Sequence, residues 1–345
     1  CQRRARQGGT CIATAGGGGP ALTAVSVSEF DLIRDYFARA TGARADVLLG
    51  IGDDCALLCP PPGLALAVGM DTLVAGRHFL ADADPFGLGH KSLAVNLSDL
   101  AAMGAQPAWA TLALTLPQVD RNWLRAFVDG FAALAAIHDV QLVGGDTTRG
   151  PLSITVQVHG FVDPSLALRR SGARAGDRLL VSGTVGDAGL ALQLMQQDLG
   201  GGSVDDRLSR RLDRPTPRVA LGRLLVGQAS AAVDVSDGLL ADLGHICAAS
   251  GVGARVELAR LPLSPAFREH CPPRQWRPAL AGGDDYELLF SLAADRVEAL
   301  RDRCRAAGEN AQEIGRLVDV PGITLVYPDG RESTEIPDGF DHFRG

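Results

Sequence analysis

The sequence predicts an α/β protein built from two domains, and three observations support this. Segments with strand-like and helix-like patterns alternate along the chain. A length of 345 residues allows two domains with cores of their own. The alternation breaks at Asp163-Pro164. We therefore expect an N-terminal domain over residues 28–165 and a C-terminal α/β domain over residues 166–345.

Residues 1–27 differ from the rest of the chain. They contain a run of glycines from Gly16 to Gly19 and show neither helical nor strand periodicity. We expect a disordered extension or a start-site artefact. A targeting segment is the second interpretation, because three arginines and no acidic residue precede Glu29.

The elements of the first domain follow from periodicity and capping signals. Helical spacing of apolar residues predicts a helix over 29–40 with Ser28 as its N-cap. Asp84-Pro85 opens a second helix that runs to Met103. The remaining expected elements are strands at 55–58, 64–68 and 110–116, a helix capped by Asp120, and strands at 140–143 and 153–162 around a GGDTTRG loop.

The second domain begins near Arg170 and again mixes strands and helices. Its expected elements are a strand at 178–181, a helix after Gly186, a helix after Asp237-Gly238, a strand at 254–258, and a strand entered by AGGDDYELLF. The segment from Gly200 to Arg214 is rich in glycine and charge, so we expect a solvated loop there.

Composition excludes several functions. A net charge of -7 without a long Lys/Arg run argues against nucleic-acid binding. No segment approaches the roughly 20 apolar residues that span a bilayer. The closest cysteine pair, Cys55 and Cys59, lacks the CxxC spacing of redox or zinc sites. We expect free thiols and a cytoplasmic location.

Seven aspartates interrupt glycine-rich or apolar segments. Burying an unpaired carboxylate costs roughly several kcal/mol unless a cation compensates. Mg2+ is the cation expected here, because it prefers carboxylates together with substrate phosphates. This pattern favours phosphoryl chemistry. The seven residues are Asp53, Asp54, Asp71, Asp99, Asp146, Asp234 and Asp237.

The helix over 84–103 carries a polar stripe. Ser92, Asn96 and Asp99 lie at i, i+4 and i+7 in a segment that is otherwise Leu, Val and Ala. A carboxylate on such a helix needs a charged or donor partner, which favours a ligand role for Asp99. Lys91 on the same helix is either a surface cation or a phosphate ligand.

The other aspartates admit simpler interpretations. Asp53-Asp54 could form only a turn, and Asp71 could be a cap or a surface ion-pair partner. The DVSDG segment could supply the N-cap of the following helix. His78 could belong to a buried pair with Phe79. These alternatives remain open from the residues alone.

The GGDTT segment offers a phosphate site. Gly144 and Gly145 allow backbone N–H groups to approach a phosphate closely, and Asp146 stands beside them for a metal. No Walker loop is present, because GLGHKS has His where Gly is required, and GIGDDC is not GxGxxG. A nucleotide site here is therefore neither Walker-type nor Rossmann-type.

Several long strings together carry a family resemblance. They are GIGDDCALL, MDTLVAGRHF, KSLAVNLSDLAAMGAQP, GGDTTRGPLSITVQVHGFV, DVSDGLLADLGHI, GGDDYELLF and a closing GFDHF. From residue 28 to about 343 the chain resembles the thiamine-monophosphate kinase family. The resemblance implies an aminoimidazole ribonucleotide synthetase-like fold, with an N-terminal sheet domain that forms a homodimer interface and ATP bound between the two domains.

The resemblance also implies roles for individual residues. The implied Mg2+ ligands are Asp54, Met70, Asp71, Asp99, Asp146, Asp234 and Asp237. The implied ATP contacts are Gly145, Asp146, Arg170 and Ser236, and the implied thiamine phosphate contacts are His78, Asp284 and Phe340. Asp71, Asp99 and Asp146 are the expected catalytic residues.

Two positions depart from the family pattern. Gly69-Met70 replaces a pair of hydroxyl residues, so a metal contact there would have to use the backbone carbonyl of Met70. Asp284 replaces Glu in the GGEDYEL string, which shortens a substrate-facing carboxylate by one methylene.

The implied reaction transfers the γ-phosphoryl group of ATP to thiamine phosphate, giving thiamine diphosphate. A phosphate monoester is already anionic near neutral pH, so it needs alignment and charge cancellation more than a general base. Several Mg2+ ions would supply that cancellation, in a direct in-line transfer. The alternatives are a sister ATP-dependent enzyme of the same superfamily and a degenerate protein that binds nucleotide or thiamine phosphate without turnover.

Overall fold

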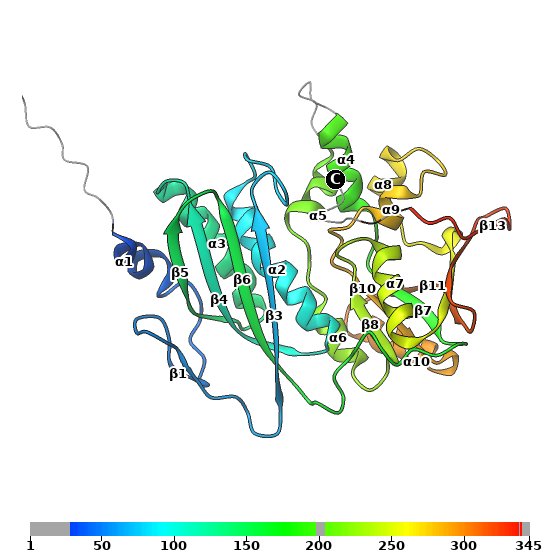
Figure 1. The fold of residues 1–345 in the computed structure, drawn as a ribbon, viewed down its shortest axis with the longest axis horizontal. Helices are drawn as coiled ribbons and strands as arrows, with labels where there is room; N and C mark the ends of the chain where they lie inside the picture. Colours follow the sequence, from blue (N-terminus) through cyan, green and yellow to red (C-terminus); the bar gives the residue numbers. More distant parts are fainter. Residues whose placement is uncertain (1–27, 198–203, 338, 340–345) are drawn as a thin grey trace, which may run out of the picture.

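The computed structural model describes residues 28–197, 204–337 and 339, and forms two domains side by side (Figure 1). The N-terminal domain has a four-stranded sheet in the order β3-β6-β4-β5. The C-terminal domain has a seven-stranded sheet in the order β13-β12-β9-β11-β7-β10-β8. The expectation of two domains with separate sheets is confirmed. β6 ends at Val162 and β7 begins at Arg178, and the expected boundary near residue 165 lies between them.

Two long helices cover one face of the first sheet. Asp84 caps the first by accepting a hydrogen bond from Gly87 N, and Asp120 caps the second by accepting from Asn122 N and Trp123 N. Both predicted helices are therefore confirmed. The elements are β3 (Ala65–Val74), α2 (Pro85–Ala102), β4 (Gln106–Leu116), α3 (Arg121–Ile137), β5 (Gln141–Arg149) and β6 (Ser153–Val162).

The chain enters this domain through a short helical segment and a hairpin. Ser28 Oγ accepts a hydrogen bond from Asp31 N, so the predicted N-cap is confirmed. The helix is shorter than expected, because it changes to a π-helical turn that ends at Phe37. These elements are α1 (Glu29–Leu32), η1 (Ile33–Phe37), β1 (Val47–Leu49) and β2 (Leu57–Leu58).

The prediction that GGDTTRG forms a loop is wrong. Residues 144–149 continue β5, which runs parallel to β4 with Gly145 opposite Leu112. Gly145 has φ +150°, and a Cβ there would lie 1.8 Å from Leu112 O. Two glycines and an aspartate weaken the strand signal of the two threonines, and the close approach of β4 leaves room only for glycine at position 145.

The second domain packs helices on its mixed sheet. Its helices are α4 (Asp187–Gln197), α5 (Asp206–Asp213), α6 (Val219–Leu225), α7 (Leu239–Ser250), α8 (Pro265–His270), α9 (Arg277–Ala281) and α10 (Val297–Ala306), with short 3-10 turns η2 (Leu258–Arg260) and η3 (Ala294–Arg296). Its strands are β7 (Arg178–Ser182), β8 (Ala231–Asp234), β9 (Gly253–Glu257), β10 (Leu288–Leu292), β11 (Ala311–Val318), β12 (Gly322–Val326) and β13 (Glu332–Ser333).

The expectation of a solvated loop over 200–214 is wrong in its described part. Residues 206–213 form α5, and Leu208 and Leu212 are buried one turn apart. Charged residues dominate the segment, but the two leucines anchor one face of the helix. Residues 200–203 lie outside the described residues.

α2 joins the two domains. It packs on β3 and β6 of its own sheet, and also against α6 and β8 of the second domain. One hydrophobic cluster continues from Leu93 and Leu97 of α2 to Leu221 and Leu225 of α6. The two domains therefore share part of their core along this helix.

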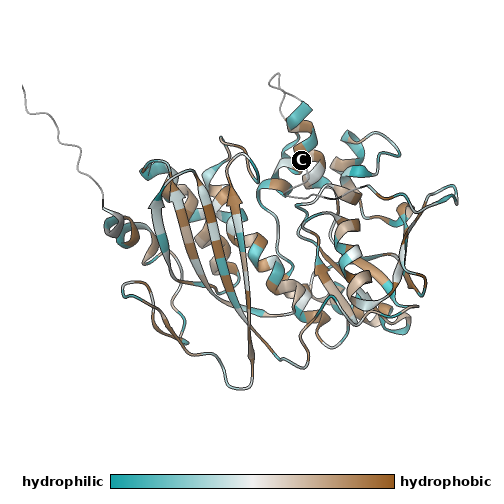
Figure 2. Ribbon diagram, viewed as in Figure 1, coloured by the Kyte–Doolittle hydropathy of each residue, from teal (hydrophilic) through white to brown (hydrophobic). Residues whose placement is uncertain are grey.

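The face of the first sheet that α2 and α3 leave open carries apolar side chains. Leu66, Val68, Met70 and Val74 of β3 alternate with inward residues and are 38–61% exposed. Figure 2 shows hydrophobic stretches along the strands of this sheet. None of the helices in the described part of the chain is long and apolar enough to cross a bilayer.

Candidate active site

Three of the expected ligands converge where α2 meets the second domain. Asp71 comes from β3, Asp99 from α2 and Asp234 from the end of β8. The polar stripe on α2 faces this region, because Asn96 Oδ1 accepts a hydrogen bond from Asp71 N at 3.0 Å. Ser98 Oγ donates to Asp234 Oδ2 at 2.7 Å. We call Asp71, Asp99 and Asp234 the carboxylate cluster.

The electrostatics of the carboxylate cluster favour a cation. Burial, with the charges of Asp234 and Asp71 added, raises the pKa of Asp99 to about 8. Burial also raises the pKa of Asp234 to about 6 and, with the charge of Asp237, the pKa of Asp71. A divalent cation would reduce this repulsion, and carboxylate oxygens are the donors that a hard ion such as Mg2+ prefers.

The alternative interpretation, in which an Asp or Ser side chain of DVSDG caps the following helix, is wrong. Gly238 is the N-cap residue of α7 and no side chain caps from that position. Instead Asp242, in the first turn, accepts from the backbone N–H groups of Ser236, Asp237 and Gly238 at 3.0–3.2 Å. Burial and the charges of Asp234 and Asp237 raise the pKa of Asp242 to about 8.

Asp242 was not among the residues expected from the sequence. Its hydrogen bonds fix the loop that carries Asp234, Ser236 and Asp237. An acid in the first turn of a helix that follows Asp-Gly was the available signal. His245 also lies near this group, since one ligand atom each of Asp237, Asp242 and His245 fall within 4.8 Å of one another.

Asp284 lies between a lysine and a tyrosine. Lys91 Nζ is 2.9 Å from Asp284 Oδ2, and Tyr286 Oη donates to Asp284 Oδ1 at 3.1 Å. Lys91 is only 4% exposed, so the interpretation as a surface cation is wrong. Because Lys91 belongs to α2, this ion pair also links the two domains.

A second group of expected residues lies elsewhere in the N-terminal domain. Asp53, Asp54, Gly145 and Asp146 line a cavity of about 390 Å³. Its remaining wall is largely apolar and includes Phe37. The arrangement combines carboxylates, a glycine-bearing strand and an apolar wall.

The strand register separates the two groups. Asp71 pairs with Val156, Val156 with Leu112, and Leu112 with Gly145. Three strand spacings amount to about 14 Å. The structure therefore brings Asp71, Asp99 and Asp234 together but leaves Asp54 and Asp146 in a separate place.

The remaining expected residues have varied positions. His78 Nδ1 accepts from Val74 N at 3.0 Å at the end of β3. The side chain of Met70 points to the open face of the sheet and is 61% exposed, whereas a Cβ on Gly69 would lie 3.2 Å from Asp99 Oδ2. Phe340 lies outside the described residues.

Arg170 acts on the carboxylate cluster. Its positive charge opposes the rise in the pKa of both Asp99 and Asp234. The backbone N–H of Ser236 donates to Asp242. Arg170 and Ser236 both belong to the C-terminal domain and lie on its side of the region around the carboxylate cluster.

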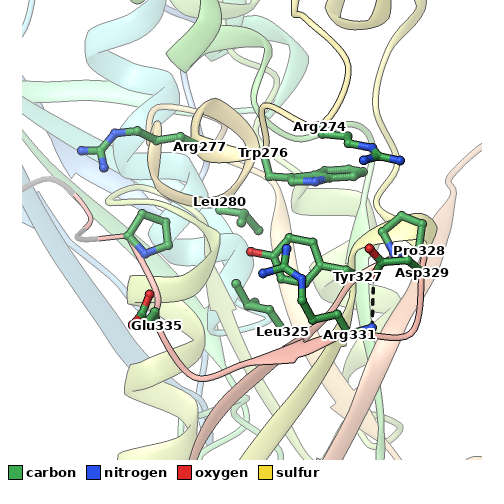
Figure 3. Close-up of a pocket in the computed structure, with 11 residues that line it drawn as sticks. Arg274, Trp276, Arg277, Leu280, Leu325, Tyr327, Pro328, Asp329, Arg331 and Glu335 are labelled. Atoms are coloured by element: carbon green, nitrogen blue, oxygen red, sulfur yellow. Dashed lines mark hydrogen bonds between the residues drawn. The ribbon is translucent and has the colours of Figure 1, made fainter.

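Another cavity, of about 370 Å³, lies in the C-terminal domain (Figure 3). Trp276 and Tyr327 stand on two of its sides, and the Arg331 guanidinium carbon is 3.9 Å from the centre of the Tyr327 ring. Among the described residues that line it, none was expected in the site from the sequence.

The fold and the carboxylate cluster define a class of protein. Residues 52–162 match the N-terminal domain of AIR synthase related proteins, and residues 174–328 match their C-terminal domain. The chain is therefore a two-domain protein of the AIR synthase related type. A hydrogenase maturation protein of Escherichia coli has the same fold at 24% identity and a TM-score of 0.76.

Closer relatives narrow the class. Thiamine-monophosphate kinase of Escherichia coli is 50% identical over 92% of this chain and 99% of its own length. The crystal structure of thiamine-monophosphate kinase from Stenotrophomonas maltophilia is also 50% identical, covers 89% of this chain and 98% of its own, and has a TM-score of 0.81. A structure described as AaThiL complexed with AMPPCP and TMP is 31% identical, covers 85% and 92%, and has a TM-score of 0.73. The chain belongs to the thiamine-monophosphate kinase family.

Proposed function

We propose that this chain transfers a phosphoryl group from ATP to thiamine phosphate and forms thiamine diphosphate, with Mg2+ at the carboxylate cluster. The observation that carries the proposal is the convergence of Asp71, Asp99 and Asp234 from three elements of two domains. Family membership supports the reaction and its ATP dependence. The raised pKa values of Asp99 and Asp234 support the metal.

The residues of the cluster have distinct tasks in this proposal. Asp71, Asp99 and Asp234 hold Mg2+, which neutralises phosphate charge when bound. Arg170 and Ser236 contact ATP from the C-terminal side. Anionic thiamine phosphate attacks in line, since alignment rather than proton removal limits such a transfer.

Asp284 orients the acceptor. Thiamine phosphate carries a positive thiazolium ring, and a carboxylate held by Lys91 and Tyr286 offers it a fixed counter-charge. His78 and Phe340 belong to the same proposed site.

In this proposal the cavity lined by Asp54 and Asp146 binds another part of ATP and its metal ions. Gly145 lets a phosphate approach the backbone of β5, and the two carboxylates hold a further Mg2+. Asp237 holds another ion near Asp242 and His245. The backbones of Asp71 and Gly145 are three strand spacings apart, about 14 Å, so we assign the two groups separate ions.

The open face of the first sheet is the proposed homodimer interface. Its exposed Leu66, Val68, Met70 and Val74 form an apolar row that a second copy would cover. A cytoplasmic location is also proposed. In the described part of the chain all five cysteines are free thiols, as expected in a reducing compartment.

The test is product formation. Purified protein is incubated with ATP, Mg2+ and thiamine phosphate, and products are separated by chromatography. Controls replace thiamine phosphate by thiamine, or Mg2+ by EDTA. We expect thiamine diphosphate only in the complete reaction. Tight ATP binding without any product would contradict the kinase and favour a binding protein without turnover.

A further inference from the structure

A buried polar network lies behind the segment that carries Asp284. Along residues 284–287 successive side chains point alternately to two different environments. Asp284 and Tyr286 bond to each other, and Asp284 also pairs with Lys91 of α2. Asp285 and Glu287 instead accept hydrogen bonds from groups of the C-terminal domain, Gly186 N and Ser182 Oγ. They are 2% and 0% exposed.

The backbone of this segment has an unfavourable conformation. Asp284 has φ +59° and Tyr286 has φ +50°, values that residues with a Cβ rarely adopt. Backbone hydrogen bonds from Asp284 N to Ser236 O and from Tyr286 N to Val235 O hold it against the loop after β8. Such a segment keeps its shape only while its surroundings hold it.

Glu287 is the centre of these surroundings. Arg218 donates to both of its carboxylate oxygens, from Nε at 2.6 Å and from Nη2 at 2.7 Å. Arg211 Nη2 donates to Oε1 at 2.7 Å, and Ser182 Oγ donates to Oε2. Four hydrogen bonds, three of them from guanidinium groups, therefore fix one fully buried side chain.

The network is also tied to α2. Arg211 belongs to α5, and Arg218 ends the connection from α5 to α6. In that connection Pro215 O is 2.9 Å from Nε2 of His90, the residue before Lys91. The arginines thus hold the 284–287 segment in a fixed position relative to the helix that supplies Lys91.

We propose that Glu287, Arg211 and Arg218 are positioning residues for the acceptor substrate, an inference that rests on the proposed function. They do not contact thiamine phosphate. They hold Asp284 and Tyr286 in the left-handed conformation in which the Asp284 carboxylate meets both Lys91 and the acceptor. Loosening Glu287 lets Asp284 move away from the site, which weakens acceptor binding while leaving the metal cluster in place.

Two variants test this. Glu287→Gln keeps the volume but removes the charge that both arginines require. Arg218→Lys keeps the charge but loses the two-pronged contact. Glu332→Gln is the matched control, because Glu332 makes a similar two-pronged pair with Arg255 but is exposed and outside the network.

The readout is the steady-state kinetics for each substrate, with folding checked by circular dichroism and thermal unfolding. We expect KM for thiamine phosphate to rise about tenfold in both variants, and KM for ATP to rise by a clearly smaller factor because the segment is hydrogen-bonded to Ser236. The control should match wild type. A merely structural role would lower kcat through loss of active protein and leave KM unchanged.

The outcomes separate the inference from the proposed function. Unchanged KM for thiamine phosphate in a folded Glu287→Gln protein overturns the inference. If that variant does not fold, the KM of Arg218→Lys decides in the same way. Wild-type protein that forms no thiamine diphosphate overturns the proposed function, and this inference with it.

Discussion

Asp99→Asn should stabilise the metal-free protein and at the same time abolish most of its activity. The substitution removes one negative charge from the carboxylate cluster at nearly constant volume. In the absence of a cation, burial and the charges of Asp234 and Asp71 disfavour this charge, so folding must keep the Asp99 carboxyl largely protonated near neutral pH. With Mg2+ bound, the same charge would be a ligand. The two effects therefore have opposite signs.

The size of the stabilisation follows from the pKa. The ordinary pKa of this carboxyl is 3.8, and in the folded protein it is raised to about 8. Stability is therefore greatest below pH 3.8 and falls as pH rises towards 8. Each pH unit in this window costs about 1.4 kcal/mol, or about 4 kcal/mol at pH 7. Because Asp71 and Asp234 share the repulsion, we expect Asn to recover about half, about 2 kcal/mol.

The assay is thermal unfolding of wild type and variant in EDTA at pH 7, together with the rate of thiamine diphosphate formation in Mg2+. About 2 kcal/mol in a protein of this size corresponds to an increase of about 3 °C in Tm. We expect the rate to fall about 100-fold or more. Asp129→Asn, on the exposed side of α3, is the control and should change neither quantity.

Two results would refute this reasoning. A variant that is less stable than wild type in EDTA would show that Asp99 is satisfied without metal. Turnover close to that of wild type would show that Asp99 is not a ligand. Either result would remove the basis for placing Mg2+ at the cluster.

Three further predictions concern the sheet, the metal and the dimer. Gly145→Ala should destabilise the protein by about 3 kcal/mol or more, because its Cβ would meet Leu112 O; a Tm within about 1 °C of wild type would contradict the β5 register. In EDTA, Tm should fall as pH rises from about 4, with the loss from Asp234 ending near pH 6 and that from Asp99 near pH 8, and Mg2+ should flatten this slope; parallel curves would count against metal binding there. Val68→Glu on the open face should convert a dimer to a monomer by light scattering, and an unchanged mass would place the interface elsewhere.

Sequence patterns predicted the elements that local rules determine. α2 has a capping aspartate, proline in its first turn and a regular apolar pattern, and its observed bounds differ from the prediction by one residue at the C-terminal end. The polar stripe of Ser92, Asn96 and Asp99 correctly indicated a polar environment on one side of this helix. These features depend only on neighbours within one or two turns.

The errors arose where contacts with residues distant in the sequence determine the structure, or where charged residues obscured a local pattern. The predicted strand ended at residue 143, because the requirement for glycine at position 145 comes from Leu112 on the adjacent β4. α5 was missed because its charges obscured the spacing of Leu208 and Leu212. Glu287 lies about 70 residues from both of its arginine partners, and a single sequence gives no register between such segments.

The carboxylate cluster and the Glu287 network show two opposite uses of buried charge. Around Glu287, guanidinium groups neutralise the carboxylate and the segment becomes rigid. Around Asp99, carboxylates repel one another across a junction of two domains, and within the described residues only Arg170 is close enough to lower the pKa of Asp99. In the proposed function, this uncompensated charge is what Mg2+ would neutralise. The rigid network, in the inference above, keeps Asp284 in a fixed position beside this site.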